Sequence, residues 1–324
     1  MTVPPLPEWA PHQAVWIGFP SASDLWLEDL APAQAEVAAF AAAVHADGKG
    51  EAVWLVAADD AAAAEARRLA PFAKVIVEPF GDIWLRDTAA IVTGSGEGRR
   101  GVDFRFNGWG GKYELPGDDT IGARLAAEAS IACSASAWIL EGGAIDGDGS
   151  GTFITTEECL LNPNRNPGFD KSEVEERLKR DLGAARVIWL GDGLLNDHTD
   201  GHVDNLARFV APGRVAIPEP TDDDPNAQAY ADAAETLLDA ELEVVAIPSP
   251  GLMERDGEII PASYMNFYIG NAAVIVPIYG ASNDAAAVEA VQELFPDRQV
   301  VGLRADHVLT GGGSFHCISQ QVPA

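Results

Sequence analysis

The chain has 324 residues and a net charge of −29, with 47% hydrophobic and 22% charged residues. This composition predicts a large packed core and excludes a disordered chain, and the length allows either two domains or one repetitive domain. The negative charge disfavours nucleic acids and anionic membranes as partners and attracts cationic ligands, although it equally suits a protein that is acidic for solubility.

No apolar segment reaches the roughly 18–20 residues that cross a bilayer, and the first residues, MTVPPLPEWAPHQ, lack the basic and then apolar pattern of a secretory signal. The three cysteines, Cys133, Cys159 and Cys317, cannot all pair and form no CxxC motif. We therefore expect a cytoplasmic protein with neither a disulfide framework nor a structural zinc site, in which Cys133 and Cys159 are small buried apolar residues.

Helices and strands follow one another in a recurring pattern. An alanine-rich helix precedes a short β-branched strand, a turn rich in glycine or acidic residues, and a hairpin-like pair of strands. The predicted helices cover residues 32–48, 60–70, 118–129, 170–183, 222–240 and 282–295. The strands that follow helices lie at 51–57, 74–78, in a run ending at 140, and at 186–190, 241–248 and 298–303, and the hairpin-like pairs at 88–93, 151–162, 206–218 and 267–280.

The turns of successive units contain Asp87, Glu141, His202, Asn266 and Cys317, at intervals of 54, 61, 64 and 51 residues. Five units of about sixty residues are typical of a repeat architecture. The helix at 32–48 and the strand at 51–57 supply the parts that the last unit lacks, which predicts a closed ring in one α/β domain spanning residues 1–324. In such a ring the five turns face a common axis; an ordinary α/β domain with accidental spacing is the alternative.

Cys317 is the candidate nucleophile. A lone cysteine is most often a small buried apolar residue, but this one follows three glycines and His316 and precedes a polar SQQ segment. Glycines let the backbone approach a ligand closely. These neighbours favour a functional thiol.

Two histidines and three aspartates crowd into nine positions, DHTDGHVDN at 197–205. Because unpaired buried charge is costly, this crowding favours a functional site. His198, His202 and Asp204 form HxxxHxD, the spacing of a helical zinc site, although Gly201 and the strand-like residues after it argue against a regular helix. The other interpretation is acid–base chemistry beside a thiol, in which His202 moves protons and Asp204 holds a cation.

Further candidates occupy two equivalent turns. Asp87, in GDIWLRDT, is either a second carboxylate of the site or a helix cap or partner of Arg86, and Glu141, in ILEGG, is either a site acid or part of a solvent-exposed turn. Trp84 either walls a pocket or packs in the core. A thiol, an imidazole and several carboxylates suit a guanidinium, whose planar N–H donors match carboxylates and whose central carbon accepts a thiolate.

The motifs WLRD, FNGWGGKY, LEGGAI, TTEECLLNPNRNP, TDGHVDN, ASYMNFYI and GGGSFHCISQQVP, with the opening segment EWAPHQAVWIGFP, resemble in order those of agmatine deiminases. These enzymes belong to the guanidine-modifying superfamily with the pentein fold, a five-bladed α/β propeller, and bacterial-type peptidylarginine deiminases share several of the motifs. The resemblance implies a hydrolase of putrescine biosynthesis that converts agmatine and water to N-carbamoylputrescine and ammonia. It implies no metal or organic cofactor, and a homodimer is common in the family.

The resemblance also implies roles for individual residues. Cys317 is the expected nucleophile and His202 the expected general acid and base. Asp87 and Asp204 match the aspartates that hold the guanidinium. Glu141 matches a substrate-site acid.

Trp84 matches a pocket residue beside the aliphatic part of agmatine. Another position departs from the family pattern. Four residues before the catalytic histidine, agmatine deiminases commonly carry Asp or Glu, whereas this chain has His198, with Asp197 as a candidate substitute. The departure leaves open a peptidylarginine or free-arginine deiminase, for which Lys112 and Arg165 are the basic candidates. A metal-dependent hydrolase using the HxxxHxD residues and a catalytically silent pentein that only binds a ligand are the remaining alternatives.

Overall fold

The computed structural model describes residues 2–221 and 223–324, whose strands form six sheets. Five of these sheets have three or four strands, and one has two. Given sheet by sheet in spatial order, the strands are β18 (Ser319–Pro323), β1 (His12–Phe19), β2 (Ala52–Ala57) and β3 (Lys74–Val77); β4 (Ile91–Thr93), β5 (Arg100–Arg105) and β6 (Ala132–Ile139); β7 (Ile145–Gly147), β8 (Thr152–Thr156) and β9 (Arg186–Leu190); β10 (Arg208–Ala211), β11 (Arg214–Glu219) and β12 (Glu243–Pro248); β15 (Tyr268–Ile269), β16 (Ala273–Ile278) and β17 (Gln299–Arg304); and β13 (Glu254–Arg255) with β14 (Glu258–Ile259).

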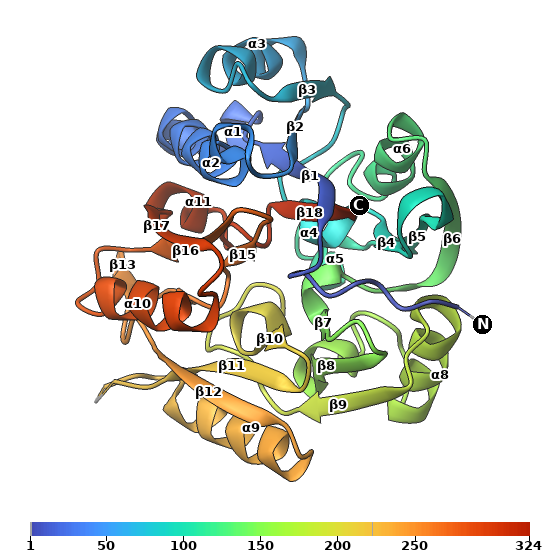
Figure 1. Ribbon diagram of the computed structural model, residues 1–324, viewed down its shortest axis with the longest axis vertical. Coiled ribbons are helices and arrows are strands. Elements are labelled where there is room, and N and C mark those ends of the chain that lie inside the picture. Colours follow the sequence, from blue (N-terminus) through green and yellow to red (C-terminus); the bar gives the residue numbers. More distant parts are fainter. Residues whose placement is uncertain (1, 222) are drawn as a thin grey trace.

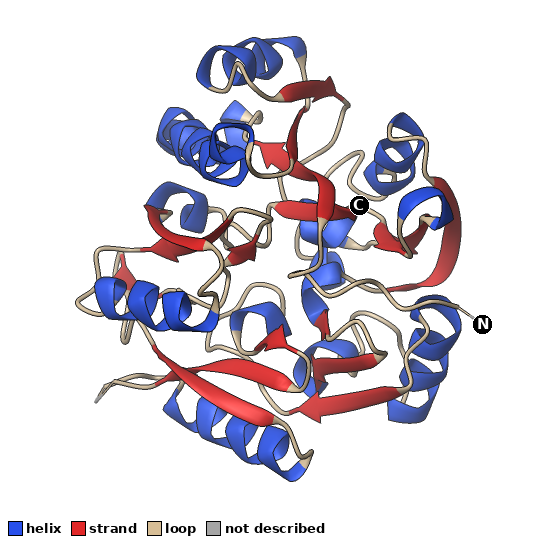
Figure 2. Cartoon of the chain, in the orientation of Figure 1, coloured by secondary structure: helices blue, strands red, loops and turns tan. Residues whose placement is uncertain are grey.

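Helices connect the strands; the longer ones lie at the periphery of the molecule, and short ones lie near its middle (Figure 2). The α-helices are α1 (Ser23–Trp26), α2 (Leu30–His45), α3 (Asp60–Leu69), α4 (Leu85–Thr88), α5 (Gly108–Gly111), α6 (Ile121–Glu128), α7 (Glu157–Leu160), α8 (Lys171–Leu182), α9 (Ala227–Asp239), α10 (Asp284–Leu294) and α11 (Asp306–Thr310). The 3₁₀ helices are η1 (Leu27–Asp29), η2 (Ala46–Gly48), η3 (Gly96–Gly98), η4 (Gly142–Ala144) and η5 (Val203–Asn205). In the described residues, no helix is long and apolar enough to cross a membrane.

The five larger sheets share one order of pairing. In each, an antiparallel pair of strands is followed by a parallel pair, as in β7–β8 and β8–β9; the same order holds for the sheets that begin with β4, β10, β15 and β18. A helix bridges each parallel pair, because parallel strands need a long crossover. Figure 1 shows these sheets set around the middle of the molecule, with α2, α6, α8, α9 and α10 as the outer crossover helices.

Helix α8 illustrates how local sequence fixes these elements. The Asp170 side chain accepts a hydrogen bond from a first-turn amide and caps the helix, and Gly183 ends it with a φ of +68°. Val174, Leu178 and Leu182 recur every four residues and are fully buried. Burying each of these side chains contributes roughly 1.5–3 kcal/mol relative to exposure.

The predicted elements agree with the structure in type more often than in extent. The predicted helix 222–240 corresponds to α9, and its first residue, Asp222, lies outside the described residues. Residues 151–162, predicted as strand, form β8 and then the short helix α7, because the Thr156 hydroxyl accepts a hydrogen bond from the Cys159 amide and caps a helical turn. The prediction that Cys133 is buried was wrong: it is exposed, on the edge strand β6.

The two end segments of the described chain share one sheet. Strand β18 pairs antiparallel with β1, with Gln320 opposite Trp16. The predicted strand 51–57, which is β2, belongs to the same sheet. The pairing of β18 with β1 also holds the segment after Cys317 inside the molecule.

The five marker residues all lie in connections that lead from one large sheet to the next. They are Asp87 between β3 and β4, Glu141 between β6 and β7, His202 between β9 and β10, Asn266 between β12 and β15, and Cys317 between β17 and β18. The repeated topology therefore brings equivalent turns toward the same region of the molecule.

Candidate active site

A cavity of about 200 Å³ contains the Cys317 thiol. Among the predicted site residues, Trp84, Asp87, His198 and Cys317 line this cavity. His202, Asp204 and Glu141 are fully buried next to them. No lysine or arginine of the described chain is among the lining residues, which include a second carboxylate, Asp82.

Cys317 follows α11 and a glycine-rich turn, and its side chain is 4% exposed. Its Sγ accepts a hydrogen bond from Asn266 Nδ2 at 3.0 Å and lies 3.6 Å from Asp204 Oδ2. Burial raises the pKa of the thiol well above its ordinary value, and the charges of Asp204 and Asp87 raise it further. In the empty site, therefore, the thiol is protonated at neutral pH.

Glycine before the nucleophile permits close packing. A Cβ atom at Gly313 would lie 2.7 Å from Cζ3 of Trp84 and 3.1 Å from the Cys317 sulfur. A side chain at this position would push the tryptophan away from the thiol. The run of glycines thus lets Trp84 form a wall of the cavity beside Cys317.

Asp87, His202 and Asp204 converge on Gly143. A Cβ atom there would lie 2.6 Å from His202 Nδ1, 2.9 Å from Asp87 Oδ1 and 3.2 Å from Asp204 Oδ2. The Gly143 amide donates to Asp87 Oδ1 at 2.9 Å, and Trp109 Nε1 donates to the other oxygen at 2.9 Å. These two donors fix the Asp87 carboxylate at the cavity wall.

Burial raises the pKa of Asp87; the His202 charge opposes this, whereas Asp204 and Glu141 add to it. The His202 ring lies 3.7 Å from Asp87, measured from Nδ1 to Oδ1. Neither of its ring nitrogens has a hydrogen-bond partner among the described residues, although the ring is fully buried. Buried polar atoms without partners are costly, so both ring nitrogens are available to a partner that the described residues do not supply.

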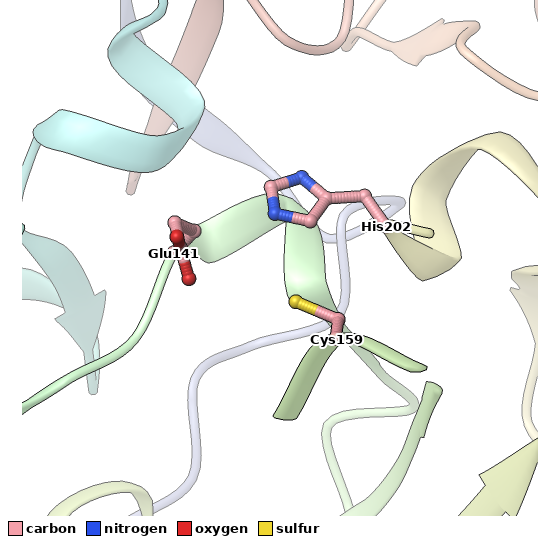
Figure 3. A group of neighbouring side chains, drawn as sticks. All are labelled: Glu141, Cys159 and His202. Carbon is pink, nitrogen blue, oxygen red and sulfur yellow. The ribbon is translucent and has the colours of Figure 1, made fainter. Parts of the chain in front are cut away.

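Glu141 lies in the interior, and its alternative as part of a solvent-exposed turn was wrong, since its residue is 0% exposed. Arg165 Nε donates to Glu141 Oε1 at 2.6 Å, while Oε2 has no partner in the described chain. Figure 3 shows Glu141, His202 and Cys159 with their polar atoms facing one another. These atoms lie within 4.8 Å of each other, and no other set of this kind occurs among the described residues.

The HxxxHxD residues are not brought together as metal ligands. His198 is exposed at the cavity, whereas His202 and Asp204 are fully buried. Asp197 does not take the place of an acid at the cavity either. Its carboxylate accepts hydrogen bonds from Thr199 and Asn205 and is absent from the cavity lining.

The two basic candidates are occupied elsewhere. Arg165 is buried, and in addition to Glu141 it binds the Asp200 carboxylate at 2.6 Å and the Thr199 carbonyl at 2.7 Å. Lys112 pairs with Asp200 and donates to the His198 carbonyl at 2.9 Å. Neither side chain lines the cavity.

Comparison with known proteins was made by sequence and by structure. The model of the family described as Porphyromonas-type peptidyl-arginine deiminase matches residues 5–323. The chain belongs to this family. A relative described as agmatine deiminase, from Stutzerimonas stutzeri (strain A1501), is 39% identical and is covered over 98% of this chain and 94% of its own length.

Solved structures are similar to this member of the Porphyromonas-type peptidyl-arginine deiminase family over nearly their whole length. The agmatine deiminase of Enterococcus faecalis has a TM-score of 0.93 at 34% identity, covering 99% of this chain and 96% of that one. A Cys-to-Ser variant of C. jejuni agmatine deiminase with substrate bound has a TM-score of 0.89 at 27% identity, with the same two coverages.

Sequence reasoning missed five residues of this site, of which Asp82 lines the cavity within the quoted segment GDIWLRDT. Trp109 lies within a quoted motif and Asn266 was a repeat marker, but neither was assigned a contact with the predicted site residues. His316 Nδ1 lies 2.7 Å from Asp204 Oδ2 and its Nε2 lies 2.8 Å from Glu8 Oε2. The position of His316 directly before Cys317 was a signal in the sequence that could have identified His316. No local sequence pattern marked Glu8 as its partner.

Proposed function

We propose that this protein is an agmatine deiminase that hydrolyses agmatine to N-carbamoylputrescine and ammonia through a covalent Cys317 intermediate. The observation that carries the proposal is a cavity that combines a cysteine with the carboxylates Asp82 and Asp87 and whose lining, in the part of the chain that the structure describes, includes no lysine or arginine. Agmatine has a guanidinium at one end and an ammonium at the other, so both of its ends suit this lining. The similarity to agmatine deiminases supports the same substrate.

Asp87 and Asp204 are the proposed guanidinium holders. Asp204 Oδ2 faces His316 and the thiol, whereas Oδ1 is buried and has no partner among the described residues. A free buried acceptor beside the nucleophile suits an N–H of the substrate. Glu141 lies next to His202 and is proposed to orient that ring, while Trp84 packs against the aliphatic chain and His198 lies at the outer part of the cavity.

The reaction proceeds in two halves. The Cys317 thiolate attacks the guanidinium carbon, which forms the C–S bond of a tetrahedral adduct. His202 donates a proton to the leaving nitrogen, the C–N bond breaks, and ammonia departs from a covalent thiouronium. His202 then takes a proton from water, and hydroxide adds to the same carbon. The C–S bond breaks as the new hydroxyl group gives its proton to the departing sulfur, which releases the product and restores the thiol. The thiol supplies the covalent catalysis, so the mechanism requires no metal or organic cofactor.

The substrate helps to ionise its nucleophile. Burial, Asp204 and Asp87 raise the pKa of the Cys317 thiol, and a guanidinium bound between the two carboxylates offsets their charges. Entry of the cation therefore lowers the pKa of the thiol at the moment when a thiolate is needed.

The proposed architecture is a single five-bladed pentein propeller. Five sheets with the same order of antiparallel and parallel pairing support five equivalent blades, and the pairing of β18 with β1 supports closure within one of them. A cytoplasmic location and a homodimeric assembly stay predictions from the sequence.

Deimination of free or peptide-bound arginine is the main rival. Free arginine carries an α-carboxylate, which would enter a cavity lined by Asp82 without a cationic partner. A silent binding module is disfavoured because a buried cysteine and two carboxylates line one cavity, and the buried His202 imidazole has no partner among the described residues.

Ammonia release from agmatine, free arginine and a blocked arginine peptide, measured side by side, tests the proposal. We expect kcat/KM for agmatine to exceed the other two by at least about 100-fold, a discrimination of about 2.7 kcal/mol. Cys317→Ser should release no ammonia while retaining the circular dichroism spectrum of the unmodified protein. Faster turnover of arginine or of the peptide would reject agmatine as the substrate.

A further inference from the structure

His316 lies between two carboxylates and is only 2% exposed. Its Nδ1 is 2.7 Å from Asp204 Oδ2, and its Nε2 is 2.8 Å from Glu8 Oε2. An ionised carboxylate can only accept hydrogen bonds, so each ring nitrogen must donate one. Both ring nitrogens are therefore placed to donate to a carboxylate.

Both carboxylates are held in the ionised form. Burial alone would raise the pKa of Glu8, but Arg208, His316 and Arg86 outweigh it and hold that pKa well below its ordinary value. Burial would likewise raise the pKa of Asp204, and the hydrogen bond and charge of His316 lower it instead, with help from His202 and Arg208.

The charges around His316 balance. Glu8 Oε2 also lies 3.0 Å from Arg208 Nη2 and 3.5 Å from Arg86 Nη2. Arg208 Nε in turn lies 3.4 Å from Asp146 Oδ2. Three carboxylates thus lie against three basic side chains. Burial raises the pKa of Asp146 and the charge of Arg208 opposes this rise. A buried ionic cluster is stable only when its charges are paired. Its members are Glu8, Asp146, Asp204, Arg86, Arg208 and His316.

The cluster leaves one oxygen of Asp204 for the substrate. His316 holds Oδ2, which also faces the Cys317 thiol, and Oδ1 stays unpartnered within the described chain. The backbone positions both groups as well, since the amides of His316 and Cys317 donate to Asn266 Oδ1 at 3.0 and 3.2 Å. Asn266 therefore positions both Cys317 and His316, the residue that holds the Asp204 carboxylate.

We propose that His316 is a positioning residue for the reaction at Cys317, which, with Glu8 as its counter-ion, keeps Asp204 charged and aims its free oxygen at the substrate guanidinium. The inference rests on the proposed function for the identity of the substrate. Glu8 lies 308 residues before His316 in the sequence. Its contact with His316 therefore connects the N-terminal segment to the positioning of Asp204.

Calorimetric titration of agmatine into Cys317→Ser and into the double variant with His316→Gln tests this role without turnover. Glutamine removes the charge and one of the two donors, so the pKa of Asp204 should rise. We expect agmatine to bind the double variant at least about 10-fold more weakly at pH 7, and the acid limb of the affinity-against-pH profile to move upward by about one pH unit or more.

His12→Gln in the same Cys317→Ser background is the matched control. His12 is also a buried histidine against a carboxylate, 3.1 Å from Glu51, but it lies outside the cluster. The His12→Gln substitution should lower the melting temperature and leave the affinity for agmatine and its pH profile unchanged. If His316→Gln lowers only the melting temperature in the same manner, His316 is merely structural and the proposal is wrong.

Two further measurements test the proposal if the His316→Gln variant does not fold. Glu8→Gln keeps the imidazole and removes its counter-ion, and should shift the acid limb in the same direction by a smaller amount. Neutron diffraction from crystals of the unmodified protein should place a deuteron on both ring nitrogens of His316; a ring with only one would overturn the proposal. Absence of agmatine binding to Cys317→Ser itself would instead reject the proposed substrate.

Discussion

The Sγ atom of Cys317 lies 3.6 Å from Oδ2 of Asp204, so the proposed nucleophile borders a buried carboxylate that opposes its ionisation. In the proposed mechanism, a cation bound between Asp204 and Asp87 removes this opposition. Reactivity of the thiol is thereby coupled to occupancy of the cavity by a cationic ligand.

Cationic alkylating agents should therefore react selectively with Cys317. We expect 2-chloroacetamidine to inactivate the protein faster than neutral chloroacetamide at pH 7, by at least about 10-fold after division by the same ratio for a small free thiol. Asp204→Asn should reduce this preference. Equal normalised rates for the two reagents would contradict the coupling.

The two buried cysteines near His202 should differ sharply in their importance. Cys317→Ser should lower kcat for ammonia release by about 10³-fold or more, because it removes the nucleophile. Cys159→Ala should keep kcat within about 3-fold, since Cys159 lies outside the cavity lining. A chelator should change neither protein; loss of activity that zinc restores would instead support metal binding by Glu141, Cys159 and His202.

Trp109→Phe should impair the reaction without unfolding the protein. It removes the 2.9 Å hydrogen bond from Nε1 to Asp87 Oδ2 and keeps the aromatic packing. We expect kcat/KM to fall by about 10- to 100-fold, as the loss of one bond to a buried charged group costs roughly 1.5–3 kcal/mol. Trp138→Phe is the control, because it removes an equivalent 2.9 Å bond to Asp181 far from the cavity lining; an equal loss of activity there would argue against a specific role for Trp109.

Asp118 should make stability depend on pH. Burial raises the pKa of this carboxyl to about 7, although the Gly81 and Asp82 amides lower it. A raised pKa means that the folded state binds the proton more tightly than the unfolded state, whose pKa is about 3.9. The contribution to stability is thus full below about pH 4 and is lost as the pH rises through about 7.

Asp118→Asn removes this titration and keeps the acceptor for the Gly81 amide, which lies 2.7 Å from Oδ1. The difference in unfolding free energy between the variant and the unmodified protein should therefore grow in favour of the variant from pH 4 to pH 8, by up to about 4 kcal/mol. Urea denaturation at several pH values measures it. A difference that is constant with pH would show that Asp118 does not titrate in this range.

Repetition made much of the site predictable. Equivalent positions in a repeat occupy equivalent places, so spacing alone indicated that Asp87, Glu141, His202 and Cys317 lie in comparable turns. The HxxxHxD spacing forms no helical metal site, for a local reason that Gly201 already indicated in the sequence. Asp200 and Gly201 have φ angles of +62° and +79°, which break any helix and leave His198 exposed and His202 buried.

Partners distant in sequence escaped prediction. Glu8 meets His316 only through the packing of whole units, and no local pattern marks such a pair. Trp109 reaches Asp87 from a segment with a φ of +53° at the tryptophan itself, flanked by glycines. Periodicity describes regular elements and does not predict where such an irregular segment directs its side chain.

The pairing of β18 with β1 has a consequence for biosynthesis. Ribosomes deliver the chain from its N-terminus, so β1 offers an open backbone edge until β18 emerges, and such edges invite aggregation. The segment that closes this edge begins two residues after Cys317. Synthesis of the last strand therefore covers the exposed edge at about the same time as it supplies Cys317. A polypeptide released before that point would lack the proposed nucleophile and would also be prone to aggregate.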